Sequence, residues 1–200
     1  MNIRNLGRGI VVAAVSLTLA ACGINSVPTA EEEAKAKWAD VEAQFQRRAN
    51  LIPNLAEIAK GAAENEQSIL VGVTEARAKA TSVQVSADDL GDTAKMEEFA
   101  AAQGQLGQGI GRLLASFEAY PQIQSNQNFL ALQSQLEGTE NRIAVALRDY
   151  NEAVRKYNTT IRTFPDTIGA NIIHGAEPLA PYSAVTEGAE VAPTLDLTSS

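Results

Sequence analysis

The sequence predicts an all-α protein, an elongated antiparallel up-and-down bundle of long helices followed by an irregular C-terminal tail. Apolar and small residues recur at steps of three or four over long stretches of the 200-residue chain. No run of alternating β-branched residues bounded by turn pairs is present. The apolar fraction of 45% is enough for a core, and the aromatic fraction of only 5% favours a slim bundle.

Residues 1–21 have the pattern of a secretory signal. Two arginines precede an apolar run at residues 10–19, and the small residues that follow lead to Cys22, the only cysteine. This arrangement resembles the lipobox of bacterial lipoproteins, in which signal peptidase cuts before the cysteine and the thiol carries diacylglycerol. The alternative is an uncleaved transmembrane anchor, but the apolar run is shorter than the roughly 20 residues that a span requires.

The charge of the mature chain limits its partners. Cleavage removes two of the 16 basic residues and no acid, which leaves 14 basic and 24 acidic residues and a formal charge of −10. This balance argues against binding nucleic acid, and against adhesion to anionic lipid through charge. Membrane contact is therefore expected from acyl chains on Cys22, since two or more chains anchor a protein stably. A single cysteine also excludes an internal disulfide.

The helical bundle is predicted to span residues 30–165. Residues 22–29 contain glycine, asparagine, serine and proline, and predict a tether between the anchor and the bundle. Thr29 has the properties of an N-cap, because three glutamates follow it in the first helical turn.

The first helix carries the apolar stripe that organises the chain, from Trp38 to Ala80. Pro53 lies within it, and proline removes a backbone donor and clashes with the carbonyl four residues back. Either the helix kinks and continues, or Asn50–Asn54 is a turn. The kink is preferred because the stripe keeps its phase across the proline, through Ala49, Ile52 and Ala56.

Two further helices are expected. A turn at residues 82–92 precedes the second helix, which Ser86 or Asp88 would cap and which Tyr120–Pro121 ends. Ser125 or Asn126 is expected to cap the third helix, which ends at Pro165. Residues 166–200 form the irregular tail, with a short turn near residue 170. The apolar stripe of the third helix is Phe129, Leu132, Leu136, Ile143, Leu147, Tyr150, Val154, Tyr157, Ile161 and Phe164.

Helix lengths place the turn at Tyr120–Pro121 beside the middle of the first helix. This placement gathers a candidate partner surface. Its two arginines suit carboxylate or phosphate groups, although the favoured role for them is in salt bridges within the bundle, for instance with Glu118. The surface comprises Arg47, Arg48, Asn50, Pro53, Asn54, Tyr120 and Pro121.

Several short motifs between residues 38 and 165 resemble the LemA family. That resemblance implies a bundle of four-helix type, exported or facing the outside of a membrane, with no established enzymatic activity. It also implies a partner, because LemA members are often encoded near membrane proteins that bear a TPM domain. The chain departs from the family in its lipobox and in Ile172-Ile173-His174-Gly175, where an aromatic Gly-Phe element is usual. The matching motifs are Arg47-Arg48, Asn50-Leu51-Ile52-Pro53-Asn54-Leu55, Lys60-Gly61, Glu118-Ala119-Tyr120-Pro121, Leu132-Gln133, Glu140-Asn141, Tyr150-Asn151, Tyr157-Asn158 and Phe164-Pro165.

A Tyr-Asn pair recurs one heptad apart, as Tyr150-Asn151 and Tyr157-Asn158. A buried tyrosine needs a partner for its hydroxyl, and an asparagine beside an apolar stripe can fix the register between helices. Register setting is the favoured role. The alternative is a groove for a polar ligand or a partner.

Catalytic chemistry is not predicted. The glycine-rich stretch at residues 106–111 follows no strand and lacks Gly-Lys-Ser/Thr, so it is not a nucleotide loop, and close helix approach or local flexibility explains it better. His174 is the only histidine, so neither a zinc site nor a cysteine–histidine dyad is expected, and no cofactor or metal is predicted.

These patterns predict a non-enzymatic envelope lipoprotein, anchored through Cys22, that acts as a scaffold or adaptor for other envelope proteins. Gly23 after the cysteine favours the periplasmic face of the outer membrane if the cell is Gram-negative. One alternative is a carrier or sensor that holds a small apolar ligand in the core near the glycines. The weakest is a hydrolase, which needs converging polar groups in a pocket. The oligomeric state stays open.

Overall fold

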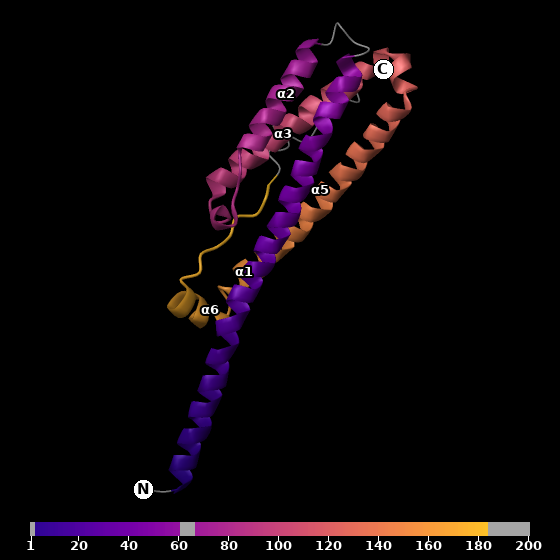
Figure 1. The fold of residues 1–200 in the computed structure, drawn as a ribbon. Coiled ribbons are helices and arrows are strands. Elements are labelled where there is room, and N and C mark those ends of the chain that lie inside the picture. The colour runs from indigo at the N-terminus through magenta and orange to yellow at the C-terminus, as the bar shows by residue number, and fades with distance from the viewer. Residues whose placement is uncertain (1–2, 61–66, 184–200) are drawn as a thin grey trace, which may run out of the picture.

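The computed structural model describes residues 3–60 and 67–183, and within these ranges the chain is helical with no strand. The predicted all-α, up-and-down bundle is confirmed (Figure 1). In Figure 1 the first helix rises from the N-terminus as a single rod, the second returns beside its upper part, the third rises again and the last descends along the first. These long helices are α1 (Ile3–Lys60), α2 (Gln67–Ser82), α3 (Thr93–Ser116) and α5 (Gln127–Thr160).

Short polar side chains begin the helices that follow the turns. The Asp92 carboxylate accepts a hydrogen bond from the Lys95 N–H at 3.1 Å and caps α3. The predicted caps are therefore wrong for α3, since Ser86 precedes a single 3₁₀ turn instead. The Asn126 side chain caps α5 as predicted, by accepting from the Asn128 N–H at 2.9 Å.

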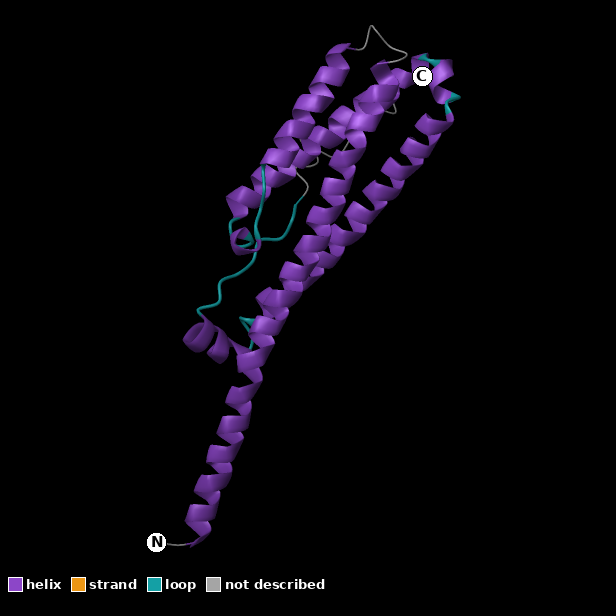
Figure 2. Cartoon of the chain, in the orientation of Figure 1, coloured by secondary structure: helices purple, strands orange, loops and turns teal. Residues whose placement is uncertain are grey.

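The predicted tether at residues 22–29 is wrong as secondary structure, because α1 runs through it without a break (Figure 2). Val27 and Ala30 are 1% and 4% exposed, so this part of α1 has packing partners that local composition does not reveal. The Thr29 hydroxyl donates to the Asn25 carbonyl one turn back, at 2.6 Å, rather than capping a helix start. The partners lie late in the chain, at Tyr157, Ile161 and Ala170.

The apolar stripe from Trp38 to Ala80 is divided between two antiparallel helices rather than carried by one. The prediction that the helix continues through Pro53 is confirmed, but α1 ends at Lys60 and α2 begins at Gln67, and residues 61–66 lie outside the described ranges. The chain therefore reverses direction between α1 and α2, and this reversal gives the bundle four long helices instead of the three expected.

Because the chain reverses direction between α1 and α2, the turn at Tyr120–Pro121 lies at a different height along the bundle axis from the one predicted. Gln103 on α3 bonds to Arg48 on α1, so these residues share one level of the bundle. The end of α3 at Ser116 lies about 20 Å further along the axis. The predicted placement of Tyr120–Pro121 beside the middle of α1 is wrong.

The core has two main apolar clusters, one in each half of the bundle. Trp38 centres the lower cluster, where its ring lies 5.4 Å from the Phe99 ring and 5.0 Å from the Tyr150 ring. The upper cluster has Phe117 and Phe129 edge to face at 5.4 Å. Members of the lower cluster include Val41, Phe45, Leu90, Met96 and Ile143, and those of the upper cluster include Ile52, Leu55, Val73, Leu106 and Leu113.

The C-terminal segment packs against the bundle. It begins with α6 (Asp166–Gly169) and a π-helical turn (Ala170–His174), and continues as extended chain to residue 183, which we call the docked tail from residue 175 onward. In Figure 2 the docked tail runs from α6 back along the bundle. Phe164, predicted to lie on the apolar stripe, is 69% exposed, because α5 ends at Thr160.

Candidate functional site

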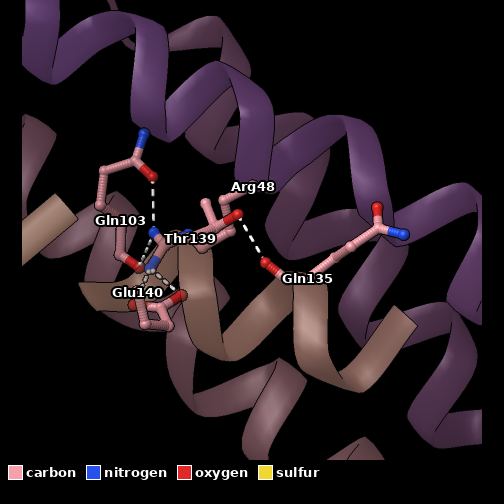
Figure 3. Close-up of polar contacts among 5 residues, drawn as sticks. All are labelled: Arg48, Gln103, Gln135, Thr139 and Glu140. Atoms are coloured by element: carbon pink, nitrogen blue, oxygen red, sulfur yellow. Dashed lines mark hydrogen bonds and ion pairs between the residues drawn. The ribbon is translucent and has the colours of Figure 1, made fainter. Parts of the chain in front are cut away.

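A layer of polar side chains crosses the bundle between its two apolar clusters. The Arg48 guanidinium on α1 donates to the Gln103 side-chain oxygen at 2.8 Å and to the Gln103 carbonyl at 3.0 Å (Figure 3). It also bonds the Glu140 carboxylate on α5 at 3.2 Å. The Gln103 amide in turn donates to the Ala80 carbonyl on α2 at 3.1 Å. Each long helix therefore contributes one group to a continuous hydrogen-bonded layer.

The layer is largely shielded from water. Arg48 is 4% exposed and Gln103 5%, while the Glu140 side chain is 50% exposed and carries the layer to the surface. The guanidinium carbon lies 5.0 Å from the centre of the Phe45 ring, which adds a cation–π contact. A buried cation is costly unless it is paired, so the helices are favoured in the relative position that pairs the two terminal nitrogens of Arg48 with Gln103 and Glu140.

Arg77 compensates for the proline inside α1. Pro53 has no N–H to donate to the carbonyl of Ala49, four residues earlier in the helix. That carbonyl instead accepts a hydrogen bond from the Arg77 guanidinium on α2, at 2.8 Å. The defect that proline creates in α1 is thus a docking point for α2.

Two asparagines hold the docked tail through its backbone. The Asn158 side chain donates to the Leu179 carbonyl at 2.8 Å and accepts from the Leu179 N–H at 2.9 Å. The Asn151 side chain makes the same pair of bonds with Tyr182, at 2.9 and 2.8 Å. Each amide therefore presents one donor and one acceptor, as a neighbouring β-strand would.

The spacing of the asparagines matches the extended chain. Seven residues of helix rise about 10.5 Å, and three residues of extended chain span roughly the same length. Asn151 and Asn158 therefore meet Tyr182 and Leu179 in turn, and the docked tail runs antiparallel to α5. Both asparagines bond the backbone of the chain's own tail. The register-setting role expected of the Tyr-Asn pairs stays a prediction.

Ala180 lies between the two asparagine clamps and is bonded on both sides. Its N–H donates to the Leu90 carbonyl at 2.8 Å, and its carbonyl accepts from the Tyr150 hydroxyl at 2.8 Å. Burial raises the pKa of Tyr150 well above its ordinary value of 10.0, so the hydroxyl stays protonated and remains a donor. Burial also raises the pKa of Tyr157 and Tyr182.

The candidate partner surface is not gathered in one place. Arg48 is buried in the polar layer, where its acidic partner is Glu140 rather than Glu118. Tyr120 and Pro121 lie at the end of the bundle, beyond α3. An exposed stripe remains on α1, formed by Arg47, Asn50, Pro53 and Asn54.

The glycines of α3 allow close helix approach. A Cβ atom at Gly109 would lie 3.4 Å from the Val73 side chain, so α2 and α3 touch there. A groove of about 590 Å³ lies between the facing ends of α1 and α2, and its lining includes Ala56, Leu70 and Thr74. Among the described residues no group of three or more histidine, cysteine, aspartate or glutamate side chains is placed to hold a metal ion.

Sequence reasoning missed Gln103 and Thr139, although both carry a readable signal. Each is a polar residue at a buried position of an apolar stripe. Gln103 joins the polar layer, and the Thr139 hydroxyl donates to the Gln135 carbonyl of its own helix at 2.7 Å (Figure 3).

Known proteins with similar sequences include magnetosome proteins. The chain is 29% identical over 187 residues to the magnetosome proteins MamQ 1 and MamQ 2 of Paramagnetospirillum magneticum, and 28% identical to MamQ of Magnetospirillum gryphiswaldense. These similarities cover 81% of this chain and 69% of each relative. The LemA family profile matches residues 37–196, which include all the residues of the polar layer and both asparagine clamps. The chain belongs to the LemA family.

Proposed function

We propose that this protein is a non-enzymatic envelope lipoprotein, held at a membrane by acyl chains on Cys22, that serves as a scaffold or adaptor for other envelope proteins. The observation that carries the proposal is the position of the lipobox cysteine within α1. Cys22 lies only five residues before Val27, which is the first buried residue among those of α1 whose side chains the structure describes. No helix in the described part of the chain offers a stretch long and apolar enough to span a bilayer.

The rod geometry suits a scaffold. About 7 Å of helix separates Cys22 from Val27, and about 57 Å separates it from the end of α1 at Lys60. An anchor at Cys22 therefore holds one end of the bundle at the membrane and carries the other end well above the lipid. Membership of the LemA family and the MamQ relatives, named as magnetosome proteins, are consistent with a role at a membrane.

Fractionation tests the anchor. The wild-type protein is expected in the membrane fraction after a high-salt wash, and the Cys22→Ser protein in the soluble fraction, because acyl chains supply the attachment and the acidic body does not. A matched control is Asn25→Ala, an exposed position whose replacement leaves the lipobox intact. If the Cys22→Ser protein stays with the membranes after the wash, acylation is not the anchor.

The exposed stripe on α1 is the surface proposed for a partner, which we expect to be a membrane protein with a TPM domain. The lipoprotein itself is expected at the periplasmic face of the outer membrane if the cell is Gram-negative. A photo-crosslinker at Asn54 should capture this partner in intact cells. The same crosslinker at the exposed Glu152 of α5 is the control. Equal capture from both positions, or capture from Glu152 alone, would contradict the assignment of the stripe.

A further inference from the structure

Exposed apolar side chains concentrate in one short segment. Phe164, Ile168, Ile172 and Ile173 are 69%, 46%, 79% and 56% exposed. Among the other residues from 25 to 183 whose exposure is described, the large exposed apolar residues are the scattered Val71, Leu130 and Val145. We call residues 164–173 the apolar foot. Single exposed apolar residues are ordinary on soluble proteins, whereas four within one turn-rich segment mark an interaction surface.

The apolar foot is a rigid part of the fold. Gly169 and Ala170 are buried, and Ala170 packs in the apolar cluster with Val27 and Ile161. The Asp166 carboxylate accepts a hydrogen bond from the Ser26 hydroxyl of α1. One face of the segment is thus fixed to α1 and α5, and the large apolar side chains lie on its free side.

The position of the apolar foot points to its occupant. It joins α1 at Ser26–Ala30, about 6–12 Å along the helix axis from Cys22. In Figure 1, α6 lies at the lower end of the bundle, beside the point where α1 continues alone toward the N-terminus. An anchor at Cys22 therefore brings the apolar foot to the depth of the lipid headgroups.

The charge of the segment fits the same occupant. The apolar foot carries one charged residue, Asp166, and Arg162 lies two residues before it, so this part of a mature protein of formal charge −10 is close to neutral. The apolar foot is a dense apolar part of the described surface, and its one acid, Asp166, accepts a hydrogen bond from the Ser26 hydroxyl. Such a surface binds lipid by burying its apolar side chains at the boundary between headgroups and acyl chains.

We propose that the apolar foot inserts into the headgroup region of the bilayer next to the anchor, and so fixes how the bundle stands on the membrane. This inference rests on the proposed anchoring at Cys22. Acyl chains on one residue leave a protein free to tilt and rotate, whereas a second contact beside the first defines its orientation. The alternative occupant of this surface is a second copy of the chain or an unrelated protein. The experiment distinguishes such a protein from lipid.

Quenching by brominated lipid tests the insertion. The acylated I172W protein is reconstituted into phosphatidylcholine vesicles with ordinary or brominated acyl chains, and its emission is corrected for the buried Trp38 with the parent protein. We expect about a twofold lower emission from the I172W indole in brominated vesicles, because bromine quenches indole only at contact depth. The V145W protein, which is altered at an exposed site on α5, is expected to be unaffected.

The outcomes are distinguishable. Equal I172W emission in both kinds of vesicle, from protein that floats with them, overturns the insertion and leaves the anchoring intact. A blue-shifted emission without bromine quenching also overturns it, because a protein surface rather than lipid then covers the apolar foot. If the Cys22→Ser protein floats as well as wild type, the acyl anchor fails, and I172W quenching in the floated fraction still decides the insertion.

Discussion

Arg48 is a single buried cation on which all four long helices depend. Its guanidinium donates a hydrogen bond to the Gln103 side chain, and the Gln103 amide donates to the Ala80 carbonyl. The half-exposed Glu140 carboxylate balances the charge of Arg48. The stabilisation from this layer therefore comes mainly from the buried hydrogen bonds rather than from the ion pair with Glu140, since solvent screens a half-exposed carboxylate.

Replacing Arg48 should cost much more stability than replacing its acidic partner. Arg48→Met keeps most of the volume but leaves the Gln103 oxygen buried without a donor, so we expect a loss of about 2–3 kcal/mol in the free energy of unfolding. Glu140→Gln should cost under about 1 kcal/mol. Urea denaturation of both variants measures the difference, and similar losses would show that the ion pair rather than the buried layer carries the energy.

Tyr150 links the stability of the docked tail to pH. Its pKa is raised in the folded protein, so the neutral form is favoured there, and the stabilisation is present below the ordinary pKa of 10.0 and lost as pH rises above it. Tyr150→Phe removes the bond to the Ala180 carbonyl and should destabilise the protein by about 1 kcal/mol at neutral pH. The difference in free energy of unfolding between the wild type and Tyr150→Phe should therefore decrease above pH 10.

Denaturation at a series of pH values measures that gap. Tyr157 and Tyr182 also have raised pKa values, but both proteins contain them, so their contributions cancel in the difference. A gap that stays constant to pH 12 would mean that the Tyr150 hydroxyl is not the buried group that couples the fold to alkaline pH.

At the scale of elements, α1 and α2 are joined at the proline of α1. Because Pro53 leaves the Ala49 carbonyl free, the Arg77 guanidinium has an acceptor that an ordinary helix would not offer. A double-mutant cycle separates this coupling from the general cost of losing an arginine. Arg77→Ala should cost about 1–2 kcal/mol in the wild type and clearly less in a Pro53→Ala background, where the restored N–H satisfies Ala49. If Arg77→Ala lowers the free energy of unfolding equally in the two backgrounds, Arg77 and Pro53 are not coupled.

The docked tail depends on two side-chain amides. Asn151→Ala and Asn158→Ala each remove two hydrogen bonds to the tail backbone, so the double variant should undock residues 179–182 while the bundle stays folded. Hydrogen exchange at the Leu179 and Tyr182 amides, expected to rise more than tenfold, reports the change. Asn141→Ala, an exposed position on the same helix, is the control. Protection that survives in the double variant would assign the docking to the apolar contacts alone.

The elements show where sequence reasoning succeeds. Trp38, Val41, Phe45, Ala49 and Ile52 are all buried as their spacing predicts, because helix periodicity directly reports which face needs a partner. The same periodicity led to a wrong prediction at the end of α1, where one continuous helix was expected. Its stripe keeps the same phase in α2, so the pattern cannot show that the chain reverses between them.

The candidate site was predictable only in part. The Tyr-Asn repeat was visible as a motif, but its ligand is a stretch of backbone, and backbone bonds leave no signature in side-chain identity. The helical conformation of residues 22–29 was hidden for a related reason, because Val27 and Ala30 pack against residues more than 120 positions later. Contacts of that sequence separation follow from the fold and not from local composition.

At the scale of the whole molecule, one rod carries both the bundle and the anchor. The bundle is fixed internally by the polar layer and the docked tail, and α1 connects it rigidly to the residue proposed to hold lipid. The mass of the mature N-terminal peptide, isolated from membranes, tests this account most directly. We expect a peptide that begins at Cys22 and carries a thioether-linked diacylglycerol. A chain that retains residues 1–21 with a free Cys22 thiol would contradict it.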